Sequence, residues 1–103
     1  MVKIVWTDQA IQDLHDIGEY IANDSVRYSQ EVVQSLYESI HILESHSKAG
    51  RIVPEYRLSH LRELIRGSYR LVYRIVDKNR IDIITVHYSA RLLKIPRISR
   101  KKL

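Results

Sequence analysis

Two rhythms of hydrophobic and polar residues divide the chain into a helical half and a strand half. Apolar residues recur every three or four positions over Ala10–Ile21 and again over Val26–Leu43, a spacing that predicts two amphipathic helices. Thr7 stands where the first helix would be capped, and the break Asn23–Ser25 stands before the second. Because this break is so short, we expect the two helices to form an antiparallel hairpin.

Short alternating stretches predict four strands, one before the helices and three after them. Gly67–Ser68 and Lys78–Asn79 suit two-residue turns between the last three strands, which are therefore antiparallel. Lys48–His60 is expected to be a loop, since Gly50 readily ends a helix and Pro54 interrupts strand pairing. The expected strands are Val2–Trp6, Leu61–Ile65, Tyr69–Val76 and Arg80–Tyr88.

The order strand, helix, helix, strand, strand, strand predicts an α+β fold in a single domain, residues 1–103. A helix hairpin needs a sheet face against which to bury its apolar stripes. We therefore expect the hairpin on one face of a mainly antiparallel four-stranded sheet. The other face is then left open, and we expect the functional residues there. A basic C-terminal tail begins at about residue 90.

The composition excludes several classes of protein. At 103 residues, with 45% hydrophobic and 28% charged residues, the chain is typical of one folded domain. It has no apolar stretch long enough to span a membrane and no secretory signal pattern, so we expect a cytoplasmic protein. The absence of cysteine excludes disulfides and thiol chemistry. The histidines lack zinc-site spacing and the three glycines form no phosphate loop, so we expect no metal and no cofactor.

Charge is distributed unevenly along the chain, whose formal net charge is +5. Residues 4–47 carry eight acidic and one basic side chain, whereas residues 48–103 carry fifteen basic and four acidic ones. A strongly basic C-terminal half favours a polyanionic partner. The alternative is that the two halves face each other and partly neutralise. In the tail, the expected contacts to nucleic acid or target are Arg91, Lys94 and Arg97.

The turn at Lys78–Asn79 allows the register of the last two strands to be worked out. A two-residue turn places Arg70 directly opposite His87, and Arg74 opposite Ile83. The open face is then expected to gather Arg70, Arg74 and His87. The same count pairs Val72 with Thr85, Tyr73 with Ile84 and, across the Gly67–Ser68 turn, Glu63 with Val72.

These side chains suit a phosphodiester site. Transesterification of RNA needs a base for the ribose 2′-OH, an acid for the leaving oxygen and cations for the phosphate. His87 or Glu55 could act as the base, Tyr88 or His87 as the acid, and Arg70 as the phosphate clamp. Arg51 and Arg74 would add contacts to the nucleic acid or target. The alternative is that an Arg–His pair on a solvated sheet face has no catalytic role.

Several sequence strings, in this order and spacing, resemble the RelE/ParE superfamily of type II toxin–antitoxin toxins. The resemblance implies this same order of elements, an antitoxin expressed from the same operon, and growth arrest when the toxin is freed. The strings are Trp6–Ala10 with Asp13, Leu14 and Ile17, Tyr20–Ser25, Gly50–Glu55, Arg62–Leu64, Tyr69–Arg74 and Val86–Arg91.

The resemblance leaves two targets open. RelE-like members, including the YoeB group, cleave mRNA on the ribosome with residue types that recur here as Glu55, Arg70, His87 and Tyr88, so this chain would be a metal-independent endoribonuclease (mRNA interferase). Fifteen residues follow the His–Tyr pair, whereas that pair lies near the chain end in YoeB-like toxins. ParE-like members inhibit DNA gyrase and need no catalytic site. Gly50–Glu55 and Arg62–Leu64 look more like this "plasmid stabilisation" branch.

The partner follows from the same resemblance and from the charge. We expect a cognate antitoxin that is acidic and partly disordered when free, and that folds as it binds the basic surface. A different class of function remains as the alternative: a small basic module that binds nucleic acid or a partner without toxicity. Its affinity for nucleic acid would fall steeply with salt.

Overall fold

The computed structural model describes residues 1–89, and residues 90–103 lie outside the described part. Its helices are α1 (Asp8–Ala22), α2 (Val26–Glu38) and a short 3-10 helix, η1 (Ser39–Glu44); its strands are β1 (Lys3–Trp6), β2 (Arg51–Ile52), β3 (Leu61–Arg66), β4 (Tyr69–Asp77) and β5 (Arg80–Tyr88). None of the described helices has both the length and the apolar character that crossing a membrane requires.

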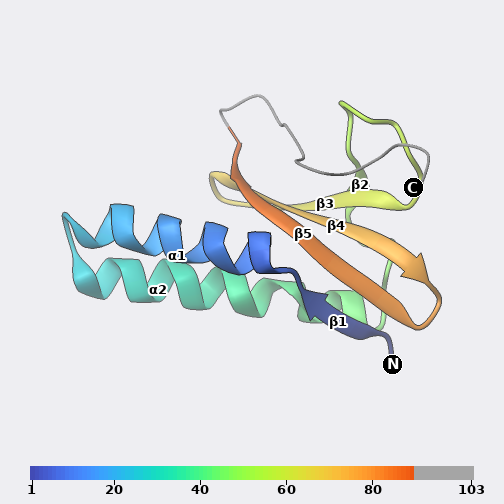
Figure 1. Ribbon diagram of the computed structural model, residues 1–103, viewed down its shortest axis with the longest axis horizontal. Coiled ribbons are helices and arrows are strands. Elements are labelled where there is room, and N and C mark those ends of the chain that lie inside the picture. Colours follow the sequence, from blue (N-terminus) through green and yellow to red (C-terminus); the bar gives the residue numbers. More distant parts are fainter. Residues whose placement is uncertain (90–103) are drawn as a thin grey trace.

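The strands form one sheet in the order β1-β5-β4-β3-β2, and the α1–α2 hairpin packs against one of its faces (Figure 1). β1 runs parallel to β5, whereas the other neighbours are antiparallel. The α+β class is confirmed, but the described sheet has five strands rather than four. The additional strand is β2, where the sequence predicts a loop: Arg51 and Ile52 pair with Glu63 and Arg62 of β3 just before Pro54.

The helix hairpin forms as its sequence pattern predicts. Thr7 accepts a hydrogen bond from the Ala10 amide and donates one to the Ile83 carbonyl, so the cap of α1 also ties the helix to β5. Ser25 caps α2 in the same way. The two helices approach closely at Gly18, whose carbonyl accepts a 2.6 Å hydrogen bond from the Ser29 hydroxyl.

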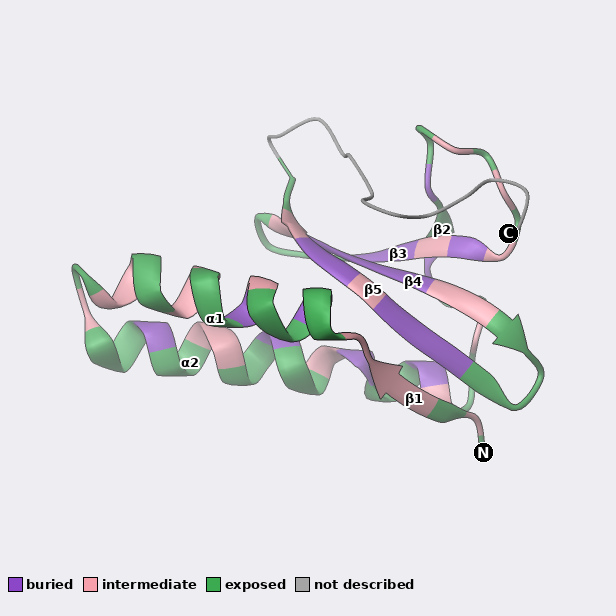
Figure 2. Ribbon diagram, viewed as in Figure 1, coloured by how far each residue is buried: buried purple, intermediate pink, exposed green. Residues whose placement is uncertain are grey.

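The main core lies between the hairpin and the sheet. Its buried side chains come from the inner sides of both helices, from η1 and from one face of β3, β4 and β5. Figure 2 shows the buried residues concentrated in these three strands, while much of the helix surface is exposed. Members include Leu14, Leu36, Leu43, Leu71, Tyr73, Ile81 and Ile83.

The second face of the sheet is partly covered rather than open. Val53, Leu61 and Val72 form a small buried cluster there, and Tyr56 and Leu58 pack against it from the segment that follows β2. This segment, residues 53–60, lies within the predicted loop Lys48–His60. The expectation of an open face is therefore wrong for this region, because apolar residues within the loop bury themselves on the sheet.

The predicted register of β4 and β5 is correct from Arg70 to Val72 and wrong from Tyr73 to Ile75. Arg70 pairs with His87 as expected, and so does Val72 with Thr85. The register then shifts by one residue at Ile84, so Arg74 faces Asp82 instead of Ile83. By the same shift, Tyr73 pairs with Ile83 rather than with Ile84, whereas Asp77 pairs with Arg80 as expected, which restores the two-residue turn. The bulge lets Ile84 pack against the second cluster while Ile83 stays in the main core.

Candidate functional site

Arg70 lies on the loop-covered face and is held by two carboxylates. Its Nε donates to Glu63 Oε1 at 2.6 Å, and its two Nη atoms donate to the two Glu55 oxygens at 2.7 Å each. Arg70 is 6% exposed and Glu63 is 1% exposed. Three of the five guanidinium N–H groups are therefore committed to carboxylates in a buried setting.

Arg51 completes this arrangement, because its Nε donates to the other Glu63 oxygen at 2.6 Å. We call Arg51, Glu55, Glu63 and Arg70 the Arg70 network. Its two positive and two negative charges balance. The hydrogen bonds to Glu55, and then to Glu63, raise the pKa of Arg70 above its ordinary value against the opposing effect of burial. The guanidinium therefore stays charged, but its charge is neutralised locally.

Arg74 pairs away from this network. Its Nη2 lies 3.4 Å from Asp82, a buried carboxylate that also accepts a 2.8 Å hydrogen bond from Arg80 Nε. The bulge at Ile84 brings about this pairing, since it moves Asp82 opposite Arg74. Arg74 is thus an ion-pair partner of Asp82.

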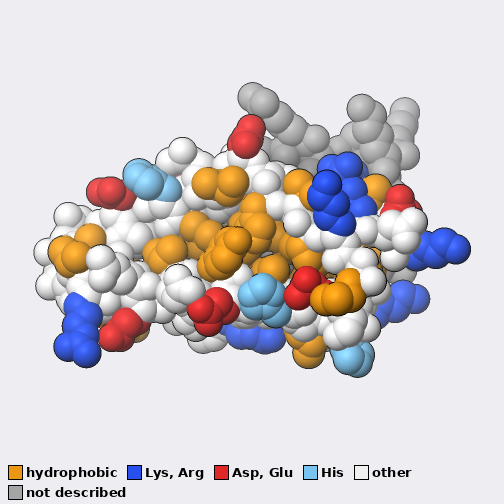
Figure 3. Space-filling view, turned by 90° about the horizontal axis from the view of Figure 1, so that it is seen from below, with side chains coloured by type: hydrophobic (Ala, Val, Ile, Leu, Met, Phe, Trp, Pro, Cys, Tyr) orange, Lys and Arg blue, Asp and Glu red, His pale blue; other side chains and the backbone are white. Residues whose placement is uncertain are grey.

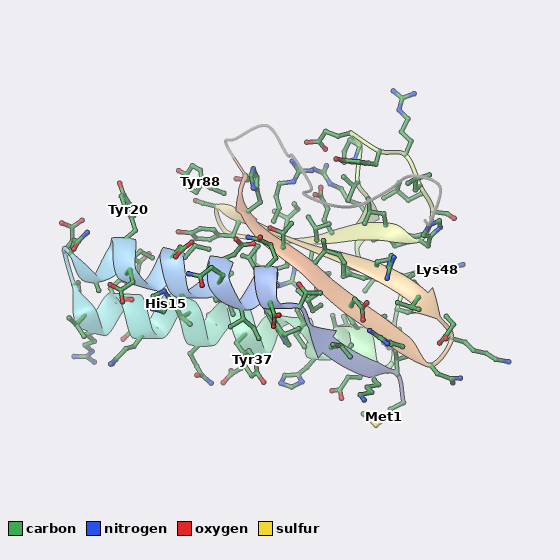
Figure 4. The ribbon with its side chains drawn as sticks, in the orientation of Figure 1. Met1, His15, Tyr20, Tyr37, Lys48 and Tyr88 are labelled. Carbon is green, nitrogen blue, oxygen red and sulfur yellow. The ribbon has the colours of Figure 1, made fainter. Side chains whose placement is uncertain are left out.

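His87 and Tyr88 line a pocket of about 590 Å³ between α1 and the end of β5. Figure 4 shows Tyr20 rising from α1 on the same side of the molecule as Tyr88. The Tyr69 and Tyr88 rings meet edge to face, with centroids 5.7 Å apart. We call this the tyrosine pocket; its polar lining comprises Asp13, Asp16, Tyr20, Tyr69, His87 and Tyr88.

The chemistry of the tyrosine pocket is acidic and aromatic. None of the described residues that line it is a lysine or an arginine, whereas Asp13 and Asp16 supply two carboxylates. Burial, and then the neighbouring Tyr88, raises the pKa of Tyr69, so its phenol stays protonated at neutral pH. Such a lining attracts cations and repels phosphate.

Comparison with known proteins decides the family. The sequence matches the family described as "ParE toxin of type II toxin-antitoxin system, parDE" over residues 4–93. The chain belongs to this ParE toxin family. Toxin RelE2 of Caulobacter vibrioides is 27% identical to this toxin over 92 residues, which are 89% of this chain and all of that protein. The chain is thus the toxin component of a type II toxin–antitoxin system.

Solved structures confirm the toxin fold. A chain of the chromosomal ParDE system from P. aeruginosa superposes with a TM-score of 0.69 at 22% identity, covering 85% of the toxin and 96% of that chain. The RelBE2 complex of Mycobacterium tuberculosis gives 0.55 at 24% identity, over 84% and 96%. The YoeB–YefM complex of Staphylococcus aureus gives 0.51 at 20% identity, over 85% and 97%. All three belong to toxin–antitoxin systems, and the shared fold extends over most of each chain.

The candidate residues of the toxin fall into two groups. Glu55, Arg70 and Arg51 come together in the Arg70 network, and His87 is the cross-strand neighbour of Arg70 on the same face of the sheet. Tyr88 faces the tyrosine pocket, whose lining also includes part of His87. Arg91, Lys94 and Arg97 lie outside the described residues. Among the described residues there is no cluster of three or more metal-ligating side chains.

Two residues of these sites carry roles that the sequence argument misses. Glu63 is predicted on the right face but not as the partner of Arg70; its signal is a lone carboxylate among apolar strand positions. Asp13 accepts a 3.0 Å hydrogen bond from the Val86 amide and another from the Thr85 hydroxyl, so it holds β5 to α1. An acidic residue on the wet face of a helix gives no local sign of this contact.

Proposed function

We propose that this ParE-family toxin arrests growth by inhibiting DNA gyrase rather than by cleaving mRNA. The observation that carries the proposal is the state of Arg70. Its Nε and both Nη atoms donate to Glu63 and Glu55, and it is nearly buried. An arginine in this state is one member of a structural ion pair, and its donors are not available to a phosphate unless that pair opens.

The energetic argument concerns what an incoming phosphate would have to displace. Binding the phosphate through the Arg70 Nη atoms would break the bidentate pair with Glu55. It would also bring a third anion close to Glu55 and Glu63. Because the Glu55 side chain is 26% accessible, separating this pair should cost more than the roughly 1 kcal/mol of an exposed pair and less than the about 3–5 kcal/mol of a fully buried one, and the phosphate contact would need to offset that cost. A preorganised site would present its cation without this cost.

The surroundings of Tyr88 point the same way, whereas the imidazole of His87 lies on the Arg70 face of the sheet, opposite to Val86 and Tyr88. A nuclease stabilises charge that develops on phosphate oxygens, and it does so with positive groups. The tyrosine pocket instead adds Asp13 and Asp16. The family match over residues 4–93 adds support, because the ParE branch implies gyrase as the target.

A second candidate, mRNA cleavage on the ribosome, rests on one specific observation. Arg70 contacts Glu55 directly and lies opposite His87, so three of the four residue types implied by RelE-like toxins are neighbours. In this alternative, docking on the ribosome would release Glu55 from Arg70. The relatives named RelE2 and YoeB favour this candidate by name only.

The deciding experiment compares the wild-type toxin with His87→Gln and Tyr88→Phe. For each, we would measure growth on induction, supercoiling by purified gyrase and mRNA cleavage on translating ribosomes. We expect all three proteins to arrest growth and inhibit supercoiling, with no mRNA cleavage above a toxin-free reaction. Tyr28→Phe, an exposed tyrosine of α2 outside the tyrosine pocket, serves as the matched control.

The opposite pattern would refute the gyrase proposal. In that pattern the wild-type toxin cleaves mRNA, and the cleavage rate falls by about 10²-fold or more in a folded His87→Gln variant. Gyrase would also supercoil DNA normally in the presence of the wild-type toxin. A cooperative urea unfolding transition like that of the wild type confirms that each variant is folded.

A further inference from the structure

We propose that the tyrosine pocket is a binding site for an arginine side chain of the cognate antitoxin. This inference is independent of the toxin's target, because it concerns only the toxin–antitoxin complex. It also runs against the overall charge of the chain, which leads one to expect acidic partner residues alone. The pocket lies between α1 and the end of β5 and has a volume of about 590 Å³, ample for an arginine side chain.

The charges of the pocket select a cation. Asp13 is fixed by hydrogen bonds from Gln9, from the Thr85 hydroxyl and from the Val86 amide, so its carboxylate is held in place. Asp16 stands one helical turn further along α1 and is held by Gln12 at 2.8 Å. No described lysine or arginine lines the pocket to neutralise them.

The wider charge pattern reinforces this selection. The helical layer that includes α1 and α2, residues 8–44, carries eight acidic side chains and one basic side chain. A partner approaching this layer therefore meets a surface whose charged side chains are mostly acidic. The tyrosine pocket lies at the border of that layer with the sheet.

The tyrosine side chains of the pocket favour a guanidinium over other cations. Tyr69 and Tyr88 meet edge to face, and Tyr20 is 78% exposed at the rim of the pocket. Arg stacks on aromatic faces and is less strongly hydrated than Lys, so such walls favour Arg. Exposed tyrosines around a pocket are also the side chains on which protein interfaces most depend.

The neighbouring strand edge explains why the ligand belongs to a polypeptide. β1 pairs with β5 only as far as Ile83, and Asp13 accepts from the Val86 amide beyond that point. Since backbone direction alternates along a strand, the Tyr88 amide points to the same side as that of Val86. The Ser89 amide, which donates to Ser68 across the hairpin, agrees with this alternation. A protein segment lying along this edge would place a side chain in the pocket, and the cognate antitoxin is the protein partner of this toxin.

A double-mutant cycle with the intact antitoxin tests the inference. On the toxin we would make Asp16→Asn and Tyr20→Leu, both exposed positions whose change should not affect folding. On the antitoxin we would replace each arginine in turn by glutamine. We expect each toxin variant to weaken binding about 3- to 30-fold, the range of a cation held on aromatic and acidic groups. One antitoxin arginine should account for the loss of affinity. Combining its replacement with a toxin variant should then weaken binding no more than either single substitution does.

Controls and a second readout make the outcome decisive. Asp24→Asn removes an exposed carboxylate from the turn between α1 and α2, outside the pocket, and should change the dissociation constant by less than about twofold. Replacing the coupled antitoxin arginine by lysine should recover only part of the affinity, since Lys lacks the planar guanidinium. If no antitoxin arginine couples to Asp16 or Tyr20, the inference is wrong. If Asp24→Asn weakens binding as much as Asp16→Asn, general attraction by the acidic layer explains the effect and the pocket has no specific role.

Discussion

At the scale of single residues, Glu63 decides how the second face of the sheet is built. Its side chain is fully buried and meets two arginines, Arg51 and Arg70, one on each carboxylate oxygen. A buried carboxylate without such partners would cost several kcal/mol. The main role of the Arg70 network is thus structural: its ion pairs allow charged side chains to be buried beneath the segment 53–60.

Removing Arg70 should therefore affect stability more than most substitutions do. In Arg70→Ala, the buried Glu63 keeps Arg51 but loses its hydrogen bond from Arg70, and Glu55 loses its bidentate contact with Arg70. We expect the free energy of unfolding to fall by about 3–5 kcal/mol, measured by urea denaturation at pH 7. Arg27→Ala is the control, because the Arg27–Glu31 pair is exposed and should contribute about 0.5 kcal/mol or less. A loss of less than about 1 kcal/mol for Arg70→Ala would show that the network is not a structural ion pair.

At the scale of elements, the link between the helical layer and β2 depends on the Tyr73 hydroxyl. Tyr73 belongs to β4 and is fully buried. Its hydroxyl accepts a 2.9 Å hydrogen bond from the Gly50 amide and donates a 2.7 Å bond to the Ser47 carbonyl. Gly50 is required at this crossing, since a Cβ there would come within 2.8 Å of the Tyr73 ring. The hydroxyl thus orders the path that leads into β2 and the segment 53–60.

Tyr73→Phe should destabilise the toxin in a pH-dependent manner. At pH 7 the loss of both hydrogen bonds should lower the free energy of unfolding by about 1–3 kcal/mol. Burial raises the pKa of Tyr73 above 10.0 in the folded state. The unfolded chain therefore loses this proton first, and wild-type stability falls as the pH rises above about 10. Tyr73→Phe has no phenol at this position and lacks this loss of stability. The free energies of unfolding of the two proteins should therefore differ less at pH 10.5 than at pH 7.

Urea denaturation at both pH values provides the measurement for this pair of proteins. Tyr37→Phe is the matched control, because Tyr37 is half-exposed and stacks on Trp6 with a ring that Phe retains. It should leave stability nearly unchanged at either pH. A difference between wild type and Tyr73→Phe that stays constant or grows at high pH would contradict the assigned role of the hydroxyl.

At the scale of the whole molecule, charge and apolar surface lie in different places. The 89 described residues contain eleven basic and twelve acidic side chains, so the net positive charge comes from residues 90–103. On the face seen from below, hydrophobic side chains gather along the middle with charged side chains around them (Figure 3). Exposed apolar side chains of the helical layer include Ile11, Val26, Tyr37 and Ile42. The folded body is thus suited to a protein partner, and polyanion binding should depend on residues 90–103.

Truncation after Ser89 tests this division. The six basic residues removed change the formal net charge from +5 to −1. We expect the full chain to be retained on immobilised heparin and released by salt, and the truncated chain to pass through at low salt. Arg27→Gln, which removes one exposed basic side chain from the body, should leave retention almost unchanged. Equal retention of the full and truncated chains would place the polyanion site on the body.

Local patterns were enough to predict most of the elements and part of the register. Helix periodicity, the caps at Thr7 and Ser25 and the two-residue turn at Lys78–Asn79 act within a few residues of one another, so they can be read along the chain. For the same reason the pairing of Arg70 with His87 was predicted correctly.

Other features depended on how distant segments meet. β2, the bulge at Ile84 and the cover formed by residues 53–60 arise because apolar side chains far apart in the sequence bury one another. The same packing brings Glu55 and Glu63 onto Arg70, and α1 beside the end of β5. The residue types of the candidate site could therefore be listed from the sequence. Only the folded chain decided that Arg70 is neutralised and that His87 and Tyr88 share a pocket with aspartates, because the environment of a charge is set by what packs around it.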